Sequence, residues 1–113
     1  MSIKEHSITA MAAALEGSHV AFFGATHDDA RAAFKAADAL APDGCEIRRT
    51  NGNESIRTRA GGSIHFLSIR SKGGRGMALD RVYVPAALAD EDVALEIEAC
   101  LATSQNPMFI GYL

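Results

Sequence analysis

The chain has 113 residues, of which 48% are hydrophobic and 22% are charged, a balance that is ordinary for one small globular domain. No apolar run approaches the roughly 20 residues of a membrane span, and the first residues lack the apolar core of a signal peptide. The net charge of −3 argues against strong, non-specific DNA binding. We therefore expect a single domain over residues 1–113, located in the cytoplasm and without a membrane partner.

Apolar residues at helical spacing begin the chain. They predict a first helix whose inward face consists of Ile8, Met11, Ala12 and Leu15. The short run over 20–23 is typical of a strand buried on both faces. A second helix follows, with Thr26 as its cap and Pro42-Asp43-Gly44 as its stop. Its predicted apolar face consists of Ala30, Ala33, Phe34, Ala37 and Leu40.

The middle of the chain changes from helical to strand spacing. Short strands are predicted over 45–49, 55–59 and 63–69, with the turn dipeptides Asn51-Gly52 and Gly61-Gly62 between them. A Gly-rich basic loop over 71–76 leads to a strand over 79–84. Acidic residues at 90–92 then open a last helix. Its predicted face consists of Val93, Ile97, Cys100 and Leu101, and a final strand covers 108–112.

The order of these elements predicts an α/β fold. Apolar strands that alternate with helices favour three layers, in which helices flank both faces of a largely parallel sheet. The strands within residues 55–69 are expected to form an antiparallel β-hairpin, inserted within or beside that sheet.

Several short motifs resemble the core of the phage terminase large subunit and, in outline, related RecA-like motor ATPases. In that family a hairpin leads to a strand, then an Arg-Gly turn, then the Walker B strand. The matching segments here are Asn51–Ile56, Gly61–Ser68, Gly74-Arg75-Gly76 and Leu79–Val84. Residues 20–40 are similar to the preceding family segment, and the strand after Pro107 is similar to the next one. The resemblance implies a RecA-like, P-loop-like core.

The motifs that hold and cleave a nucleotide in that family do not occur here. Walker A needs Gly-x-x-x-x-Gly-Lys followed by Ser or Thr, and the resemblance implies that this chain begins at the helix after it. Walker B acids should follow Val84, where the chain has Pro85-Ala86-Ala87. The resemblance therefore implies a truncated, non-catalytic relative without cofactor or metal, placed in the host cytoplasm if a phage encodes it.

Basic side chains concentrate in the middle of the chain. Residues 46–81 hold eight basic and three acidic residues, whereas residues 82–113 hold five acidic and no basic ones. In the loop over 71–76, glycine amides can approach an anion. The candidate anion- or nucleic-acid-binding residues are Arg57, Arg59, Arg70, Lys72, Arg75 and Arg81. The alternative is a solvated loop beside strands with outward arginines, and the lack of interleaved aromatics argues against base stacking.

The histidines, the acidic clusters and the cysteines can be explained without catalysis or metal binding. The histidines His6, His19, His27 and His65 have no metal-ligand spacing, so we expect structural or surface roles. The acidic residues at 28–29 and 90–92 each lie in the first turn of a predicted helix, where the helix dipole favours negative charge, so they need no metal to explain them. The cysteines at 45 and 100 are in no metal or redox spacing, which predicts free thiols. We therefore predict no catalytic and no metal-binding residue.

The last strand is apolar at its end, and it can form an edge that pairs with a second copy or another protein. The predicted interaction residues are Phe109, Tyr112 and Leu113, and the alternative is an ordinary core strand.

The leading hypothesis is a non-enzymatic binding protein that contacts a protein partner or forms a homo-oligomer, and so modulates a host or phage DNA-processing machine. One alternative is nucleic-acid binding through the segment Arg48–Arg81. Another is an enzyme that takes a phosphorylated substrate in the Gly-rich loop.

Overall fold

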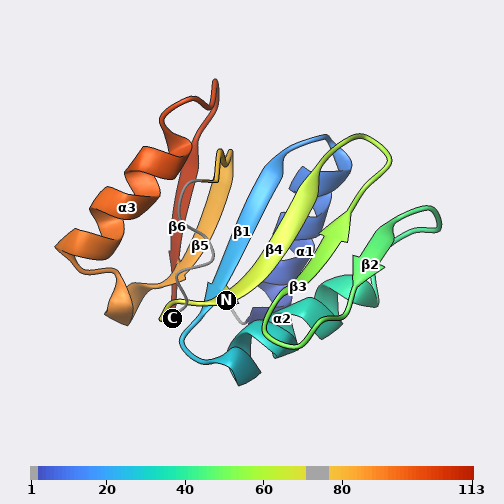
Figure 1. Ribbon diagram of the computed structural model, residues 1–113, viewed down its shortest axis with the longest axis horizontal. Helices are drawn as coiled ribbons and strands as arrows, with labels where there is room; N and C mark the ends of the chain where they lie inside the picture. Colours follow the sequence, from blue (N-terminus) through green and yellow to red (C-terminus); the bar gives the residue numbers. More distant parts are fainter. Residues whose placement is uncertain (1–2, 71–76) are drawn as a thin grey trace.

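The computed structural model describes residues 3–70 and 77–113, which fold around one six-stranded sheet (Figure 1). From edge to edge the strands are β2 (Glu46–Arg48), β3 (Glu54–Arg57), β4 (Ser63–Ser68), β1 (His19–Gly24), β5 (Arg81–Pro85) and β6 (Met108–Tyr112). The last four of these run parallel, while β2 and β3 extend the sheet beyond β4 as antiparallel neighbours. The predicted hairpin is thus confirmed as β3–β4.

Helices cover both faces of the sheet, which confirms the three-layer α/β fold. Two of them, α1 (Ile3–Leu15) and α2 (His27–Asp38), lie behind the sheet in Figure 1. The third, α3 (Glu91–Leu101), lies on the other face at the β6 end, after the short 3-10 helix η1 (Ala86–Leu88). Among the described residues, no helix combines the length and the apolar character that crossing a membrane requires.

Two apolar clusters hold the layers together. Because successive residues of a strand point to opposite faces, Phe22 packs toward α1 and α2, and Phe23 packs toward α3. The predicted cap of α2, Thr26, is confirmed by a hydrogen bond, and the structure shows that Asp90 caps α3 in the same way. The amide of Asp29 donates to the Thr26 hydroxyl at 3.1 Å, and the amide of Val93 donates to the Asp90 carboxylate at 2.9 Å.

The predicted inward face of α1 is wrong by part of a turn. Ile8 and Leu15 are 45% and 42% exposed, and Leu40, beyond the end of α2, is 48% exposed. The buried residues of α1 are His6, Ser7, Ala10, Met11, Ala13 and Ala14. Small side chains are buried because α1 lies close to α2, as the Ser7 hydroxyl shows by donating to the Ala33 carbonyl at 3.2 Å.

The β3–β4 turn is anchored on the end of α1. The Thr58 hydroxyl donates to the Ala14 carbonyl at 2.8 Å and accepts the Gly62 amide at 3.1 Å. A Cβ atom on Gly62 would lie 2.0 Å from the Ala14 carbonyl oxygen. Only glycine permits this approach, so the hairpin end of the sheet has a fixed position against α1.

Candidate functional site

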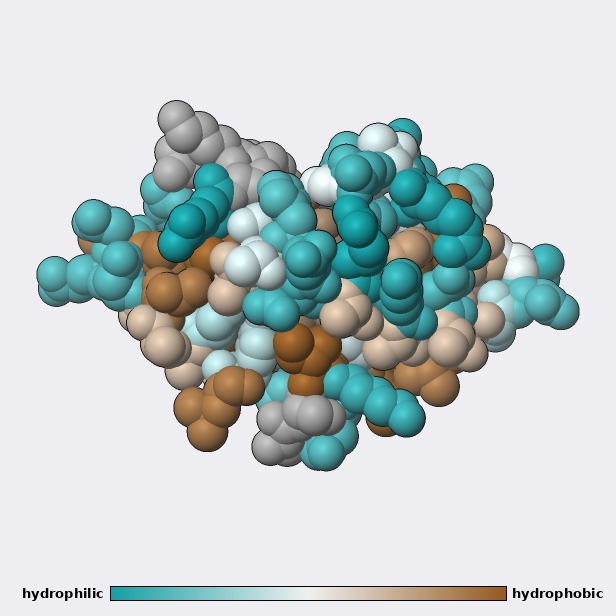
Figure 2. Space-filling model, turned by 90° about the horizontal axis from the view of Figure 1, so that it is seen from below, coloured by the Kyte–Doolittle hydropathy of each residue, from teal (hydrophilic) through white to brown (hydrophobic). Residues whose placement is uncertain are grey.

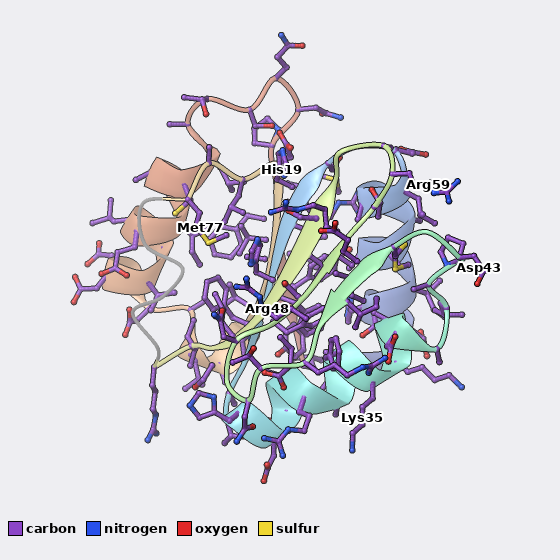
Figure 3. The ribbon with its side chains drawn as sticks, turned by 45° about the vertical axis from the view of Figure 1, so that its right-hand side comes forward. His19, Lys35, Asp43, Arg48, Arg59 and Met77 are labelled. Atoms are coloured by element: carbon purple, nitrogen blue, oxygen red, sulfur yellow. The ribbon has the colours of Figure 1, made fainter. Side chains whose placement is uncertain are left out.

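The predicted basic residues do not gather on one surface. Lys72 and Arg75 lie outside the described residues. Arg59 lies in the turn before β4, and Arg70 follows the other end of that strand. Since β4 has six residues, about 17 Å separate its two ends. Figure 3 likewise shows Arg59 well away from Arg48.

The sheet itself separates the remaining two arginines. Ile56 is buried on the α1 side, so its neighbour Arg57 points to the face that carries α3. Arg81 points the opposite way, and its guanidinium donates to the Tyr83 hydroxyl at 3.1 Å on the α1 side. Arg57 and Arg81 therefore cannot share one binding surface, because they point to opposite faces of the sheet.

Among the residues that the structure describes, those that cover the α3 face of the sheet lie toward its β6 end. The buried cluster beneath α3 contains residues of β1, β4 and β5 but none of β2 or β3. Beyond it the strand register lines up two polar rows, which we call the open sheet face. They are Glu46, Arg57, Ser63 and His19 in one row and Arg48, Ser55 and His65 in the next. Figure 2 shows hydrophilic side chains gathered at its upper right, where these strands lie.

The consecutive residues Arg48 and Arg49 lie on opposite faces of the sheet. Arg49 lies on the α2 side, where it forms an ion pair with Asp38 at 2.6 Å and lies 5.7 Å from the centre of the Phe34 ring. Arg48 is exposed on the open sheet face. Within the described part of the chain, neither Arg48 nor Arg57 makes an ion pair. Two guanidinium groups are thus left available on one face.

A hollow of about 290 Å³ lies on the open sheet face, between these arginines. Its lining residues are Glu46, Ile47, Arg48, Ser55, Arg57 and His65. Burial, together with the positive charges of Arg57, His19 and Arg48, holds the pKa of His65 below its ordinary value. With two arginines and one glutamate, the lining of the hollow carries a net positive charge. Sequence reasoning placed His65 on one sheet face but could not find its neighbours, because they come from strands paired only in the fold.

The other edge of the sheet is β6, where the predicted interaction residues differ from one another. Phe109 is 38% exposed, and Leu113 is fully exposed. The prediction that Tyr112 is an interaction residue is wrong, because Tyr112 is buried and its hydroxyl donates to the Phe23 carbonyl at 2.5 Å. Burial, with a smaller effect of the Asp29 charge, raises the pKa of Tyr112, so the hydroxyl stays a donor. Tyr112 is a core residue that holds β6 in place.

A groove of about 400 Å³ runs between β6 and the end of α3. It is lined by Glu98, Leu101, Ala102, Ser104, Pro107 and Phe109. Its apolar and acidic lining contrasts with the basic open sheet face at the far end of the sheet.

Solved structures of phage terminases share this arrangement of helices and strands. An arginine-to-alanine variant of the Thermus phage P74-26 large terminase ATPase domain matches 96% of this chain with a TM-score of 0.71 and 20% identity. The chain has the fold of part of a phage large-terminase ATPase domain. A second structure of that domain gives a TM-score of 0.64 at 19% identity. A large terminase of another thermophilic bacteriophage gives 0.61 at 13% identity, again over 96% of this chain.

The terminase-like fold is only part of each matched structure. The chain spans 53% and 54% of the two ATPase-domain structures and 29% of the longer terminase. No protein-family model and no curated protein sequence matches the chain.

In this terminase-like fold, the strand that the sequence resemblance identifies with Walker B is β5. It ends at the buried Pro85 and continues into the exposed η1, so no carboxylate directly follows it. Over residues 3–70 and 77–113, no group of three or more His, Cys, Asp or Glu side chains is arranged to hold a metal ion.

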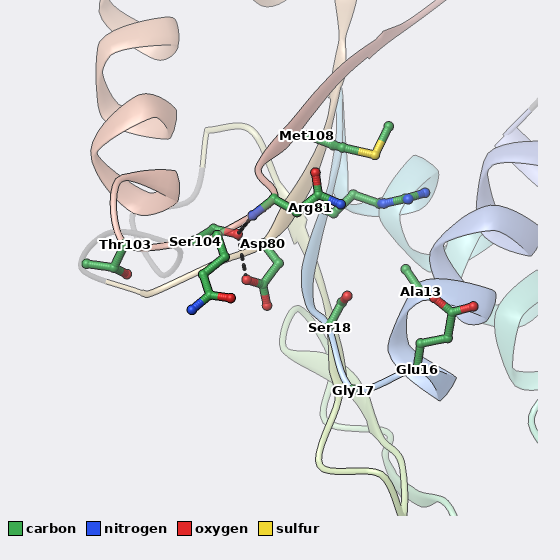
Figure 4. A pocket seen from close by; sticks show the side chains of 11 residues that line it. Ala13, Glu16, Gly17, Ser18, Asp80, Arg81, Thr103, Ser104 and Met108 are labelled. Carbon is green, nitrogen blue, oxygen red and sulfur yellow. Dashed lines mark hydrogen bonds between the residues drawn. The ribbon is translucent and has the colours of Figure 1, made fainter.

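A polar pocket of about 400 Å³ lies where β1, β5 and β6 begin (Figure 4). Asp80 is central to it, accepting the His19 amide at 2.9 Å and the Ser104 hydroxyl at 2.7 Å. These two hydrogen bonds, the His19 bond first, hold the pKa of Asp80 below its ordinary value. The backbone carbonyl of Asp80 also accepts the Met108 amide at 2.9 Å. Asp80 therefore joins the three strands, and its polar groups are engaged by the fold.

Proposed function

We propose that this chain is a non-catalytic binding protein with a terminase-like fold, and that it binds another protein chain by strand addition at β6. The observation that carries the proposal is the open edge of the sheet. Within the described residues β6 pairs with β5 on one side and with no strand on the other. An edge strand presents unpaired backbone groups to which a second strand can bond.

The direction of the backbone identifies the groups available for this pairing. The Met108 amide donates to the Asp80 carbonyl, so it faces β5. Successive residues of a strand turn their backbone groups to opposite edges, so Phe109 and Gly111 turn theirs outward. A partner strand would bond to these two residues and cover the exposed part of the Phe109 ring.

A second copy is the partner that the chain itself supplies. Two copies that pair β6 with β6 in antiparallel orientation form one continuous sheet across a two-fold axis. Met108 and Phe109, which are 40% and 38% exposed, would then be shielded from water. A strand of a host or phage DNA-processing protein could occupy the same edge, and would be recognised by the same backbone bonds.

Two features support a role without catalysis. The sequence holds no Walker A string, and Pro85-Ala86-Ala87 stands where Walker B acids are expected. ATP turnover by the purified chain would contradict this part of the proposal.

The test compares two substitutions at one position. Phe109→Pro removes an outward amide without removing a bond to β5, whereas Phe109→Ala removes only the ring. We expect light scattering after size-exclusion chromatography to show a dimer for the wild type, a weakened dimer for Phe109→Ala and a monomer for Phe109→Pro. A wild-type chain that stays monomeric at millimolar concentration contradicts self-pairing, and equal behaviour of the two variants contradicts strand addition.

The two alternatives remain predictions. Nucleic-acid binding through the segment Arg48–Arg81 would involve only those basic residues that share one face of the sheet, since Arg57 and Arg81 point to opposite faces. The phosphate-substrate enzyme depends on residues 71–76, which lie outside the described residues.

A further inference from the structure

We propose that the hollow in the open sheet face is a binding site for a phosphate-type oxyanion, held between Arg48, Arg57 and His65. The site is independent of the β6 edge and of the protein contact proposed there. It is built by β2, β3 and β4, at the opposite end of the sheet.

The strand register brings two guanidinium groups to one hollow. Ser55 stands directly opposite Arg48 on one side and His65 on the other, and Arg57 follows Ser55 on the same face. Diagonal neighbours of this kind have Cα atoms about 7–8 Å apart, so long side chains can reach a common ligand. Guanidinium groups bind tetrahedral oxyanions through paired N–H donors, and the Ser55 hydroxyl can add a hydrogen bond from the floor.

The charges around the hollow favour an anion, with one opposing group. Arg48 and Arg57 are exposed and have no carboxylate partner in the described part of the chain. Burial is the main cause that lowers the pKa of His65, and the charges of Arg57, His19 and Arg48 lower it further. Glu46 lies opposite Arg57 and lines the hollow, so it opposes the ligand. The size of about 290 Å³ suits a phosphate or sulfate group and its nearest substituents.

A bound dianion reverses the effect of the arginines on His65. It stabilises the protonated imidazole, so binding becomes tighter as the pH falls and His65 takes up a proton. The groups that face His65 are Arg48 and Glu46 from β2, Arg57 and Ser55 from β3, and His19 from β1.

The experiment titrates the full chain with sodium sulfate at constant ionic strength, set with sodium chloride, and follows imidazole and backbone amide signals by NMR. Sulfate remains a dianion across the range used, so any pH dependence belongs to the protein. We expect saturable shifts confined to the hollow, and tighter binding at pH 5.5 than at pH 7.5. Shifts that are linear, or spread over the whole surface, overturn the proposal.

Matched variants separate the site from general charge. Arg57→Gln should weaken sulfate binding about tenfold, the scale of one charge-assisted hydrogen bond, and Glu46→Gln should strengthen it about threefold. Arg59→Gln makes the same change in net charge outside the hollow and should leave binding unchanged. His65→Gln should remove most of the pH dependence. Equal effects of the substitutions at Arg57 and Arg59 overturn the site, and amide spectra confirm that each variant is folded.

Two further probes identify the source of the oxyanion. If a short oligothymidylate shifts the same signals at much lower concentration than inorganic phosphate, the site takes a nucleic-acid backbone. If inorganic phosphate shifts them and the oligomer does not, the site takes a free phosphate group. Either result supports an oxyanion site, and the absence of binding by all three probes overturns it.

Discussion

The two edges of the sheet differ in ways that decide what each can bind. β2 has three residues, and the exposed ones, Glu46 and Arg48, are charged. Short, charged edges resist the addition of a strand. β6 has five residues, exposes Met108 and Phe109, and lies in a segment with no basic residue after Arg81. The β2 edge is thus short and charged, whereas β6 is the longer and more apolar edge of the sheet that the structure describes.

The two ends are also held in place differently. The hairpin end depends on close backbone contact between Gly62 and Ala14, whereas β6 depends on side-chain hydrogen bonds of Tyr112 and on Asp80. Substitutions at the two ends should therefore change the free energy of unfolding by different amounts.

Gly62→Ala should have the largest effect. The new Cβ would lie 2.0 Å from the Ala14 carbonyl oxygen, so the hairpin or α1 must move, at a cost of about 3 kcal/mol. Urea denaturation measures the loss. Gly111→Ala in β6 is the matched control, because its Cβ would meet the Ala86 Cβ at 3.4 Å and the Ala86 Cα at 3.7 Å, without a clash. Equal losses of unfolding free energy for the two variants would contradict the view that the hairpin end of the sheet is held by close backbone contact and the β6 end is not.

Tyr112→Phe should cost about 1–2 kcal/mol, because it removes the hydrogen bond to the buried Phe23 carbonyl. The reverse exchange at an exposed site, Phe109→Tyr, should change stability by less than about 0.5 kcal/mol. Hydrogen exchange of the β6 amides should rise in the first variant only. A neutral Tyr112→Phe would show that other contacts hold this edge.

Asp80→Asn should cost about 1 kcal/mol at pH 7 and less in acid. The folded-state pKa of Asp80 lies below its ordinary value of 3.8, so its stabilisation is present above that pH and is lost as the pH falls through the folded pKa. Denaturation curves of wild type and variant should therefore differ at pH 7 and converge near pH 2. A difference that persists in acid would mean that the Asp80 charge plays no part.

The smallest effects should distinguish two adjacent arginines at the protected edge. Arg49→Gln loses the ion pair with Asp38 and the contact with the Phe34 ring, at a cost of about 0.5–1 kcal/mol. Arg48→Gln loses no ion pair and should leave the unfolding midpoint unchanged. A similar loss for both would argue that Arg48 serves stability rather than binding.

Patterns along the chain predicted much of the fold. The cap of α2 at Thr26, the hairpin around Gly61-Gly62 and the final strand follow from local chemistry, which acts between residues close in sequence. The face of α1 was not predicted, because the small residues that let two helices approach carry a weaker apolar signal than Ile8 and Leu15. The core position of Tyr112 depends on Phe23, which is remote in sequence.

The α/β order of elements and the concentration of basic residues in the middle of the chain can be read from the sequence, and the resemblance of its motifs implied a terminase-like fold. Which of the basic residues meet depends on the pairing of the strands. Strand alternation sends Arg57 and Arg81 to opposite faces, and pairing across three strands brings Arg48, Arg57 and His65 to one hollow. The physical reason is that a side chain's direction is set locally, whereas its neighbours are set by which strands pair.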